Sequence, residues 1–391
     1  MSNRDAVIVS AVRTPIGRQG GALASLNAHE FGAVVLKEAL RRAGVNADQI
    51  DDVIFGNVLS GGGNIARLTA LQTGLSLEIP GLTIDRQCGS GINAVNIVAQ
   101  AIKSGAGDIY VAGGTESMSL APYLMDRATK AYSPVPPRFR SSQLSPKEIG
   151  DPPMGITAEN LVKKYNITRE EQDAYSFRSQ QRMAAAMEQD FYKEQIVPID
   201  IPVRKGEPIT FSVDEHPRPN TTLEGLAKLA PAFLEGGTVT AGSSSGLNDA
   251  ASALVVMSRE KASELGLKPL AVIRDYAVSG VDPNIMGIGP VPAVRKLLKR
   301  TGLTINDIDL VELNEAFASQ VIACNRELEI NEEKLNVNGG AIAHGHPLGA
   351  TGAILMTKAI YELQRTNKRT AIITACIGGG QGIATLIERE G

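Results

Sequence analysis

Two reactive side chains, Cys88 and His346, stand 258 residues apart at matching places of a repeated pattern. Each begins a glycine-containing turn before a helical pattern: Cys88-Gly-Ser-Gly-Ile-Asn-Ala-Val and His346-Pro-Leu-Gly-Ala-Thr-Gly-Ala. The positive end of a helix stabilises a thiolate and disfavours a protonated imidazole. Both effects suit a nucleophile and its base, so we predict that Cys88 and His346 form a catalytic pair. The structural alternative is a small buried thiol and a hydrogen-bonded turn histidine.

A second thiol, Cys376, ends an apolar strand pattern and precedes Ile-Gly-Gly-Gly-Gln-Gly. This turn can present backbone N–H groups to a developing oxyanion, and the thiol can donate and accept a proton. A buried thiol at a strand end is the alternative. The turn matches neither a phosphate-binding loop nor an intact dinucleotide fingerprint. Cys324, within the helical pattern at 317–328, is predicted to be a core residue.

Asn314 follows the strand pattern at 309–313, where the next helix should begin. As a helix N-cap it would be structural, but at the carboxyl end of a sheet it can also orient a water or polarise a carbonyl. His344 is either a second base or, more simply, a turn residue. No third histidine or paired carboxylate stands at ligand spacing, so we expect no metal site. His29 and His216 carry no motif.

The chain as a whole contains an internal repeat. Residues 31–55 and 289–313 share a helical pattern, a glycine stop and an Ile-Asp-x-Val strand. Short apolar runs at 52–56, 108–113 and 370–375 are typical of strands buried on both faces. We therefore predict an α/β fold of two duplicated α/β/α layered halves, related by a pseudo-twofold axis, with the functional site between them.

The stretch between the repeats differs in character. It is richer in proline and charge, and a polar helical pattern at 157–191 contains aromatic residues that a linker would lack. We predict an inserted loop domain at 119–248. The N-terminal half would then comprise 1–118 plus about 249–270, and the C-terminal half 271–391.

Composition limits the classes of function. Lys and Arg number 39 against 42 Asp and Glu, a formal net charge of −3, so there is no overall basic field for nucleic acid. No apolar run approaches the ~18 residues of a membrane span, and no signal peptide is visible. Three cysteines, an odd number, suit a reducing compartment. We expect a cytoplasmic protein without membrane or nucleic-acid partners.

Several motifs together resemble one known family. They are Gln-Cys-Gly-Ser-Gly at 87–91, Gly-Gly-Thr-Glu-Ser-Met-Ser at 113–119, Gly-Ser-Ser-Ser-Gly-Leu-Asn-Asp at 242–249, Asn-Glu-Ala-Phe-Ala at 314–318, Gly-Gly-Ala-Ile-Ala-His-Gly-His-Pro-Leu-Gly-Ala-Thr-Gly at 339–352 and Cys-Ile-Gly-Gly-Gly at 376–380. In this order, and over essentially the whole length, the chain resembles the thiolases, acyl-CoA:acetyl-CoA C-acyltransferases. The resemblance implies a thiolase-like fold.

The resemblance also implies roles for five residues. Cys88 would be the acylated nucleophile, His346 the base that activates it, and Cys376 the acid and base that exchanges the α-proton of acetyl-CoA. Asn314, through a water, and His346 would hold one thioester oxygen. The backbone N–H groups of Cys88 and Gly378 would form the second oxyanion site. The kinetics should be ping-pong, since the enzyme stores an acyl group between two half-reactions.

Substrate contacts follow from the same resemblance. Coenzyme A and acyl-CoA would be substrates, with no permanently bound cofactor. Arg218 would lie near the nucleotide end of CoA, and Ser245 and Gly246 along the pantetheine. The acyl pocket would be walled by Met154, Met286 and Phe317. The inserted domain would cover CoA, and the chain would form a homo-oligomer, either a dimer or a dimer of dimers.

The leading hypothesis is a thiolase that reversibly condenses two acetyl-CoA to acetoacetyl-CoA and CoA, or cleaves the product. A thiolase for longer 3-ketoacyl-CoA in fatty-acid degradation is the rival, because Pro153 stands where short-chain thiolases usually carry a histidine near CoA. A ketoacyl synthase-type condensing enzyme is disfavoured by the second thiol, Cys376. A non-catalytic binding module would leave the matched Cys88 and His346 without a purpose.

Overall fold

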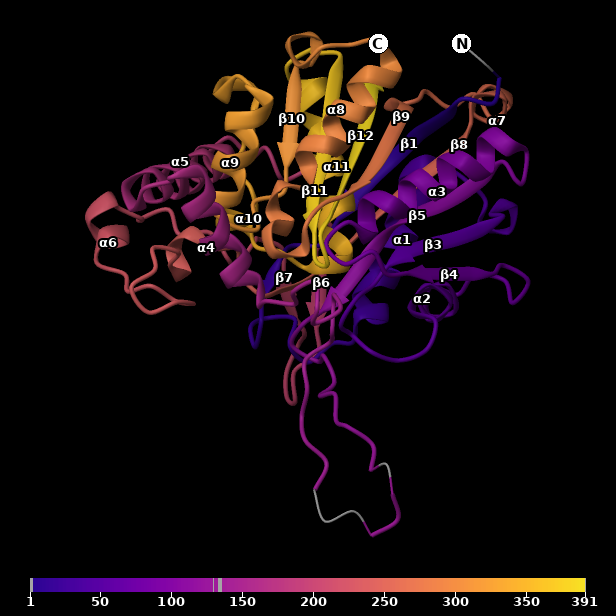
Figure 1. Cartoon of the computed structure of the whole chain (residues 1–391). Helices are drawn as coiled ribbons and strands as arrows, with labels where there is room; N and C mark the ends of the chain where they lie inside the picture. The colour runs from indigo at the N-terminus through magenta and orange to yellow at the C-terminus, as the bar shows by residue number, and fades with distance from the viewer. Residues whose placement is uncertain (1–2, 129, 133–135, 391) are drawn as a thin grey trace.

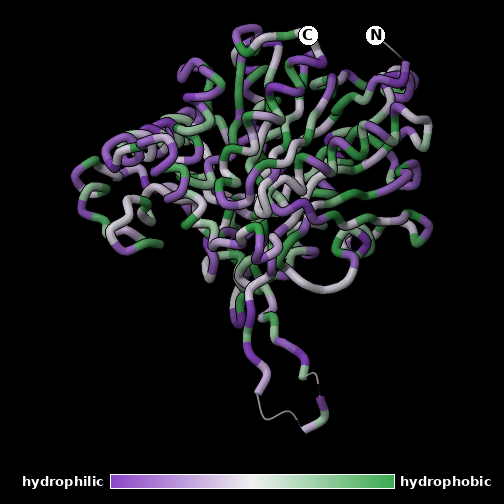
Figure 2. Tube along the Cα trace, in the orientation of Figure 1, coloured by the Kyte–Doolittle hydropathy of each residue, from purple (hydrophilic) through white to green (hydrophobic). Residues whose placement is uncertain are grey.

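The computed structural model describes residues 3–128, 130–132 and 136–390, and the chain is a layered α/β protein (Figure 1). A single twisted sheet runs through both halves, and hydrophobic residues follow its strands (Figure 2). From the middle of the chain, helices and a long loop leave the sheet, and the loop protrudes well beyond the body of the molecule. The architecture thus has a duplicated body and an insertion.

The N-terminal half forms one side of the sheet. From the sheet edge inward, the strand order is β4 (Gly81–Ile84), β3 (Asp52–Gly56), β5 (Ile109–Ser117), β8 (Asn248–Ser258) and β1 (Ala6–Arg13). The β4, β3 and β5 strands pair in parallel, and β8 pairs antiparallel with both β5 and β1. The short β2 (Gly17–Arg18) adds to β8. β8 follows the insertion in the chain, so the N-terminal half of the sheet contains strands from both sides of the insertion.

The C-terminal half repeats this pattern. Its strand order from the other edge is β10 (Leu310–Leu313), β11 (Thr370–Ile377), β12 (Gln381–Arg389) and β9 (Ala271–Gly280). The first pair is parallel and the next two are antiparallel, as in β3, β5, β8 and β1. The halves join where β1 pairs with β9 at Val7 with Val272 and Ile8 with Ala271. The predicted duplication and pseudo-twofold arrangement are confirmed.

Helices cover the sheet in three layers, each with its own apolar core. The outer face of the N-terminal half packs against α1 (Ala28–Ala43) and α2 (Ile65–Thr73). The outer face of the C-terminal half packs against α8 (Pro290–Thr301) and α9 (Ala318–Leu328). Between the halves lies a third core that contains α3 (Ser90–Ser104) and α11 (Leu348–Arg365). This central layer is buried from both sides.

The two central helices touch through glycines in their first turns. A Cβ on Gly91 of α3 would lie 2.8 Å from the backbone nitrogen of Ala353 and 2.9 Å from the carbonyl oxygen of Gly349. A Cβ on Gly352 would lie 2.3 Å from the backbone nitrogen of Ile92. Real side chains cannot occupy such positions, so glycine at both places lets the helix backbones approach this closely. The N-terminal ends of α3 and α11 therefore meet.

The insertion contains α4 (Met154–Tyr165), α5 (Arg169–Glu188) and α6 (Leu223–Ala227), together with a small sheet of β6 (Ile199–Ile201) and β7 (Ile209–Phe211). The polar pattern at 157–191 is therefore two helices rather than one. Asn166 ends α4 in the left-handed region at φ 49°, and Thr168 starts α5 with a capping box to Glu171. The residue boundaries given for the three parts of the chain stay a prediction.

Candidate active site

Cys88 and His346 occupy equivalent places at the crossing of the two central helices. Cys88 stands two residues before the first residue of α3, and His346 two residues before the first residue of α11. Because the first turns of these helices are in contact at Gly91 and Gly349, both side chains belong to one site. The structure thus brings the predicted nucleophile and base together from opposite halves.

A strained turn presents Cys88. Gln87 has φ 45°, a left-handed conformation that non-glycine residues adopt only when neighbouring contacts hold it. The Asp85 carboxylate accepts a hydrogen bond from the Gln87 backbone N–H at 2.7 Å. The Ser90 hydroxyl donates to the Gln87 carbonyl at 2.6 Å and accepts from the Arg86 backbone N–H at 2.8 Å. These contacts fix the turn from both sides and leave Cys88 half-buried at its tip.

Hydrogen bonds determine which nitrogen of His346 carries the proton. The Thr351 hydroxyl donates its one hydrogen to the Pro347 carbonyl at 2.9 Å, so its 2.7 Å contact with His346 Nδ1 must have Nδ1–H as the donor. Nε2 then keeps its lone pair. Asn314 Nδ2 lies 3.3 Å from Nε2 and donates to it. His346 is therefore arranged as a neutral base with Nε2 facing Asn314.

The backbone of His346 is held by Asn248, which begins β8. Asn248 Oδ1 accepts from the His346 backbone N–H at 2.9 Å, and its Nδ2 donates to the Gly17 carbonyl at 2.9 Å. Gly345, with φ 100°, passes so close that a Cβ there would lie 2.3 Å from the Asn248 side chain. His346 is thus held by a hydrogen bond to β8 of the N-terminal half.

Burial is the main influence on the pKa of both side chains. It raises the pKa of Cys88 to about 11, although the backbone N–H of Gly378 and its own N–H act in the opposite direction. The expected stabilisation of a Cys88 thiolate is therefore not found, because desolvation of the charged form outweighs these backbone donors. Burial lowers the pKa of His346 to about 4, which agrees with the expected neutral imidazole.

Cys376 lies in β11 at the centre of an apolar cluster. It is fully buried, and its partners in this cluster are Ala158, Val239, Met286, Ala316 and Phe317, with Met154 and Val162 at the edge. Burial raises the pKa of Cys376 well above its usual range, and the nearby Cys88 adds to this effect. The two thiols therefore lie near each other. The three residues predicted to wall the acyl pocket, Met154, Met286 and Phe317, belong to or pack against the cluster that contains Cys376.

Asn314 is not a helix N-cap, because α9 begins four residues later at Ala318. Its backbone N–H instead donates to the Thr374 carbonyl of β11 at 2.9 Å, and its side chain is fully buried against His346. Asn314 Oδ1 accepts no hydrogen bond within the described part of the chain. The neighbouring Glu315 carboxylate anchors this turn by accepting from four donors: Tyr175 (2.8 Å), Ser179 (2.7 Å), Asn336 (3.0 Å) and the Ile342 N–H (3.1 Å).

Gly378 lies in the turn between β11 and β12, and its backbone N–H lies close enough to the Cys88 sulfur to lower the pKa of that thiol. A Cβ on Gly378 would lie 2.9 Å from Leu144 and 3.8 Å from the Met154 sulfur. Gly379 and Gly380 follow with φ 81° each, a conformation natural for glycine. The predicted backbone donor is therefore at the nucleophile.

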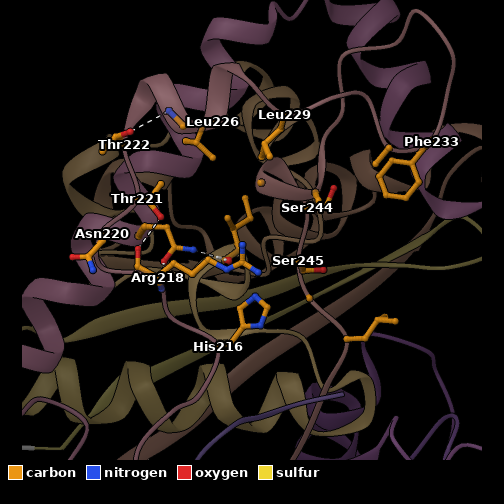
Figure 3. Close-up of a pocket in the computed structure, with 18 residues that line it drawn as sticks. His216, Arg218, Asn220, Thr221, Thr222, Leu226, Leu229, Phe233, Ser244 and Ser245 are labelled. Atoms are coloured by element: carbon orange, nitrogen blue, oxygen red, sulfur yellow. Dashed lines mark hydrogen bonds between the residues drawn. The ribbon is translucent and has the colours of Figure 1, made fainter. Parts of the chain in front are cut away.

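A cavity of about 630 Å³ is lined almost entirely by residues of the insertion, with Ile342 from the body, and Figure 3 shows its lining. The cavity contains all three residues predicted to contact CoA, namely Arg218, Ser245 and Gly246. The remaining lining is mostly small or apolar, which suits a long ligand with few charged groups. Among the described residues, the Arg218 guanidinium has no recorded hydrogen bond or ion pair, so it is available to an anionic ligand.

Two residues of the cavity lining contact residues that the sequence predicts for the site. Leu247 lines it and forms a parallel bridge with His346. Phe233 also lines it, and its ring meets Phe317 edge to face with centroids 5.9 Å apart. A ligand in the cavity would therefore have one end near His346 and the cluster around Cys376, and the other near Arg218.

Cys324 and His344, the other residues considered from the sequence, are buried and hydrogen-bonded to backbone carbonyls. Cys324 is buried in the core of the C-terminal half, and its thiol donates to the Gly287 carbonyl at 3.2 Å. His344 is buried, and its Nδ1–H donates to the Gly345 carbonyl at 2.9 Å. The described residues contain no group of three or more His, Cys, Asp or Glu side chains that could hold a metal ion. Nor does any helix there have the length and apolarity to cross a membrane.

Sequence reasoning missed His216, Asn248 and Thr351. His216 lines the cavity, but nothing in its neighbourhood forms a motif. Asn248 belongs to one of the quoted signatures, and Thr351 stands five residues after His346, in the first turn of the expected helix. A hydroxyl so close to His346 in the sequence is a signal that could have identified Thr351 as a hydrogen-bond partner.

Two family models cover the chain almost completely. Residues 6–260 match the thiolase N-terminal domain, and residues 267–389 match the thiolase C-terminal domain. The chain belongs to the thiolase family. As a thiolase it is an acyltransferase, and the duplicated fold, the two thiols and the histidine agree with that class.

Known thiolases are similar over their whole length. The acetyl-CoA acetyltransferase of Syntrophomonas wolfei is 50% identical over 394 residues, covering 98% of this chain and 99% of that protein. The crystal structure of the Bacillus anthracis acetyl-CoA acetyltransferase superposes with a TM-score of 0.95 at 45% identity, covering 99% of each chain. Human mitochondrial 3-ketoacyl-CoA thiolase in complex with CoA has a TM-score of 0.93 at 42% identity, covering 100% of this chain and 99% of that one.

The protonation states predict how the thiolase reacts with iodoacetamide. Cys88 should be alkylated in preference to the buried Cys324 and Cys376. Its rate should rise about tenfold per pH unit between about pH 7 and pH 10, because the thiolate fraction grows in that way below a high pKa. Peptide mass spectrometry measures the rate at each site, and Cys88→Ser is the control. A rate that levels off below about pH 8 would instead indicate a preformed thiolate and imidazolium pair.

Proposed function

We propose that this thiolase interconverts two acetyl-CoA with acetoacetyl-CoA and CoA, using Cys88, His346 and Cys376 as its reacting groups. The observation that carries this proposal is the convergence of both thiols and the neutral histidine at the crossing of α3 and α11, beside a cavity whose Leu247 pairs with His346 and whose Phe233 packs on Phe317. Carbon–carbon bond formation at a thioester needs a nucleophile that stores the acetyl group and a base that removes an α-proton. The site contains one thiol for each task.

In the first half-reaction, His346 Nε2 takes the proton of Cys88, and the sulfur attacks the thioester carbon of acetyl-CoA. The oxyanion that forms is held by the backbone N–H groups of Cys88 and Gly378. The carbon–sulfur bond to CoA then breaks. Cys376 gives its proton to the departing CoA thiolate, which leaves acetyl-Cys88, a Cys376 thiolate and a protonated His346.

In the second half-reaction, the Cys376 thiolate removes an α-proton from the second acetyl-CoA. The enolate oxygen is held by His346 Nε2–H, which now carries the proton from Cys88, and by a water bound to Asn314 Oδ1. The enolate carbon attacks acetyl-Cys88 and the Cys88 sulfur leaves. That sulfur regains its proton from His346, so every group returns to its starting state.

The cavity supports CoA and acyl-CoA as the substrates, with no resident cofactor needed for any of these steps. We assign the Arg218 end to the negatively charged nucleotide of CoA and the Ser245 and Gly246 wall to the pantetheine. The insertion then covers the bound substrate. The three free cysteines agree with a reducing compartment, and we propose the cytoplasm as the site of action.

The acyl pocket predicts a short-chain preference. Phe317 is held in place by Phe233, and together with Met154 and Met286 it leaves an apolar wall close to Cys376. Thiolysis with free CoA should therefore have a higher kcat/KM for acetoacetyl-CoA than for a ten-carbon 3-ketoacyl-CoA, by about tenfold or more. The assay follows loss of the 3-ketothioester, with Cys88→Ser as the inactive control.

The competing hypotheses give other results in this assay. A preference for the longer substrate would place the chain with the thiolases of fatty-acid degradation. No turnover of either substrate would contradict the proposed function, and would favour a condensing enzyme of the ketoacyl synthase type or a binding protein.

The division of labour between the thiols can be tested with Cys376→Ser. This variant should still form acetyl-Cys88, but exchange of the methyl protons of acetyl-CoA with D₂O should fall by about 10²- to 10⁴-fold, because serine is a far weaker acid and its neutral hydroxyl a poor base. Intact-protein mass spectrometry measures the acylation, and NMR measures the exchange. Cys324→Ser is the matched control, since its hydroxyl keeps the bond to Gly287. Normal exchange in Cys376→Ser would refute the assigned role.

We also propose a homodimer formed through the β4 edge of the sheet. This edge strand has no outer neighbour in the described part of the chain, and exposed leucines surround it: Leu68, Leu71, Leu77 and Leu82. An unprotected strand edge beside apolar side chains is typical of a pairing surface. The protruding loop exposes Tyr123, Met125 and Phe139, and would serve as the further surface of a dimer of dimers (Figures 1 and 2).

Light scattering at micromolar concentration should therefore give the mass of a dimer or of a tetramer. Leu82→Lys should shift the mass towards the monomer, because it places a charge in the interface. Leu265→Lys changes an exposed leucine of similar exposure away from β4, and should leave the mass unchanged. A monomeric wild-type protein would contradict the proposal.

A further inference from the structure

His216 lies in the cavity between the cationic end and the catalytic histidine. It stands two residues before Arg218, and its ring points up towards Ser245 in Figure 3. The neighbouring wall runs through Gly246 and Leu247 to Asn248, which holds the backbone of His346. A ligand that extends from Arg218 to His346 must therefore pass His216.

The position of the His216 ring is fixed by packing. A Cβ on Gly246 would lie only 2.2 Å from His216 Cε1 and 2.8 Å from Nδ1. The absence of a side chain at Gly246 thus makes the space that the imidazole occupies. The ring lies against the cavity wall and does not extend freely into solvent.

The hydrogen bonds of Asn248 determine the tautomer of His216. Asn248 Oδ1 accepts from the His346 N–H, so its other atom is the Nδ2 amide. This amide lies 3.4 Å from His216 Nδ1 and donates to it. Since a neutral imidazole has one N–H, the proton of His216 is on Nε2. Within the described residues no partner is recorded for this Nε2–H.

His216 keeps this neutral form at physiological pH. Burial, together with the nearby guanidinium groups of Arg218 and Arg18, lowers the pKa of His216 to about 4, and the carboxylates of Glu215 and Asp214 oppose this only in part. The cavity therefore has two different polar contacts along its length. Arg218 offers a charged fork suited to phosphate, and His216 offers one neutral donor suited to an uncharged acceptor.

We propose that His216 is a substrate-binding residue whose Nε2–H donates a hydrogen bond to an amide carbonyl oxygen of the pantetheine arm of CoA. The inference rests on the proposed use of CoA substrates. The pantetheine arm links the charged nucleotide to the reacting sulfur and contains two amides, so an amide carbonyl must lie between Arg218 and His346. Asn248 connects His216 to the His346 backbone, and so fixes the donor and the base relative to each other.

Three substitutions of His216 distinguish the contributions of its two ring nitrogens to substrate binding. His216→Gln can place an amide N–H near the position of Nε2, His216→Asn retains a polar group only on the Nδ1 side, and His216→Phe removes both. The KM for CoA in thiolysis should rise about fivefold to tenfold in the Phe and Asn variants, the usual effect of one lost hydrogen bond, with the loss in KM rather than kcat. The Gln variant should restore most of the affinity. His29→Phe, on α1 and outside the cavity lining, is the matched control.

Acetoacetyl-pantetheine as the substrate tests which part of CoA is bound. The His216→Phe effect should persist with this truncated substrate, and an effect confined to full-length CoA would overturn the pantetheine assignment. An unchanged KM in His216→Phe would overturn the proposal. So would an equal loss of kcat in all three variants with a lowered melting temperature, because it would show a structural role.

Failure of the proposed function can be distinguished from failure of the His216 proposal. If the wild-type enzyme turns over no 3-ketoacyl-CoA, the proposed activity is contradicted. Calorimetric titration of the intact protein with CoA then still tests His216, through the ratio of Kd between wild type and His216→Phe. A higher Kd for CoA in His216→Phe than in the wild type would support the contact, and equal Kd values would contradict it.

Discussion

The close contact between the first turns of α3 and α11 is the constraint on which the site depends. Gly91 and Gly352 have no side chains, so the backbones meet directly at the centre of the molecule. Each helix is embedded in the core between the two halves, which leaves little freedom to slide or rotate. As a result the residues just before these helices, Cys88 and His346, are positioned by a buried and closely packed layer of the protein.

Burial at this crossing gives the site its chemical character. Both thiols and the histidine are neutral in the free protein, because every charged form would be desolvated. In the proposed mechanism, charge develops only when protons move between these groups. The Gly378 N–H lies at the Cys88 sulfur before any charge develops, so little reorganisation would be needed there.

Much of this organisation could be predicted from the sequence. The repeat at a spacing of 258 residues gave the duplicated fold and paired Cys88 with His346, because the periodic patterns of strands and helix starts are local. The protonation of Cys88 could not be predicted, since it depends on how closely the other half encloses the thiol. For Asn314 the sequence left a helix N-cap and a site residue both open, and the start of α9 at Ala318 excludes the cap. Its contact with His346 joins residues 32 positions apart.

His216 shows a different limit of sequence reasoning. Its place in the cavity results from the fold of the insertion, and its tautomer from Asn248 on a strand of the body. No pattern within a few residues of His216 contains either contact. A residue whose surroundings come from two parts of the chain is visible only when both parts are placed.

The duplication also bears on how such a site can arise. A symmetric pair of identical half-chains would present the same residue type at both helix starts, either two cysteines or two histidines. A nucleophile facing a base at this crossing requires two copies that are encoded separately and can change independently. The asymmetry between Cys88 and His346 is therefore a property that two identical half-chains could not have, whereas the glycine contact beneath them is compatible with both arrangements.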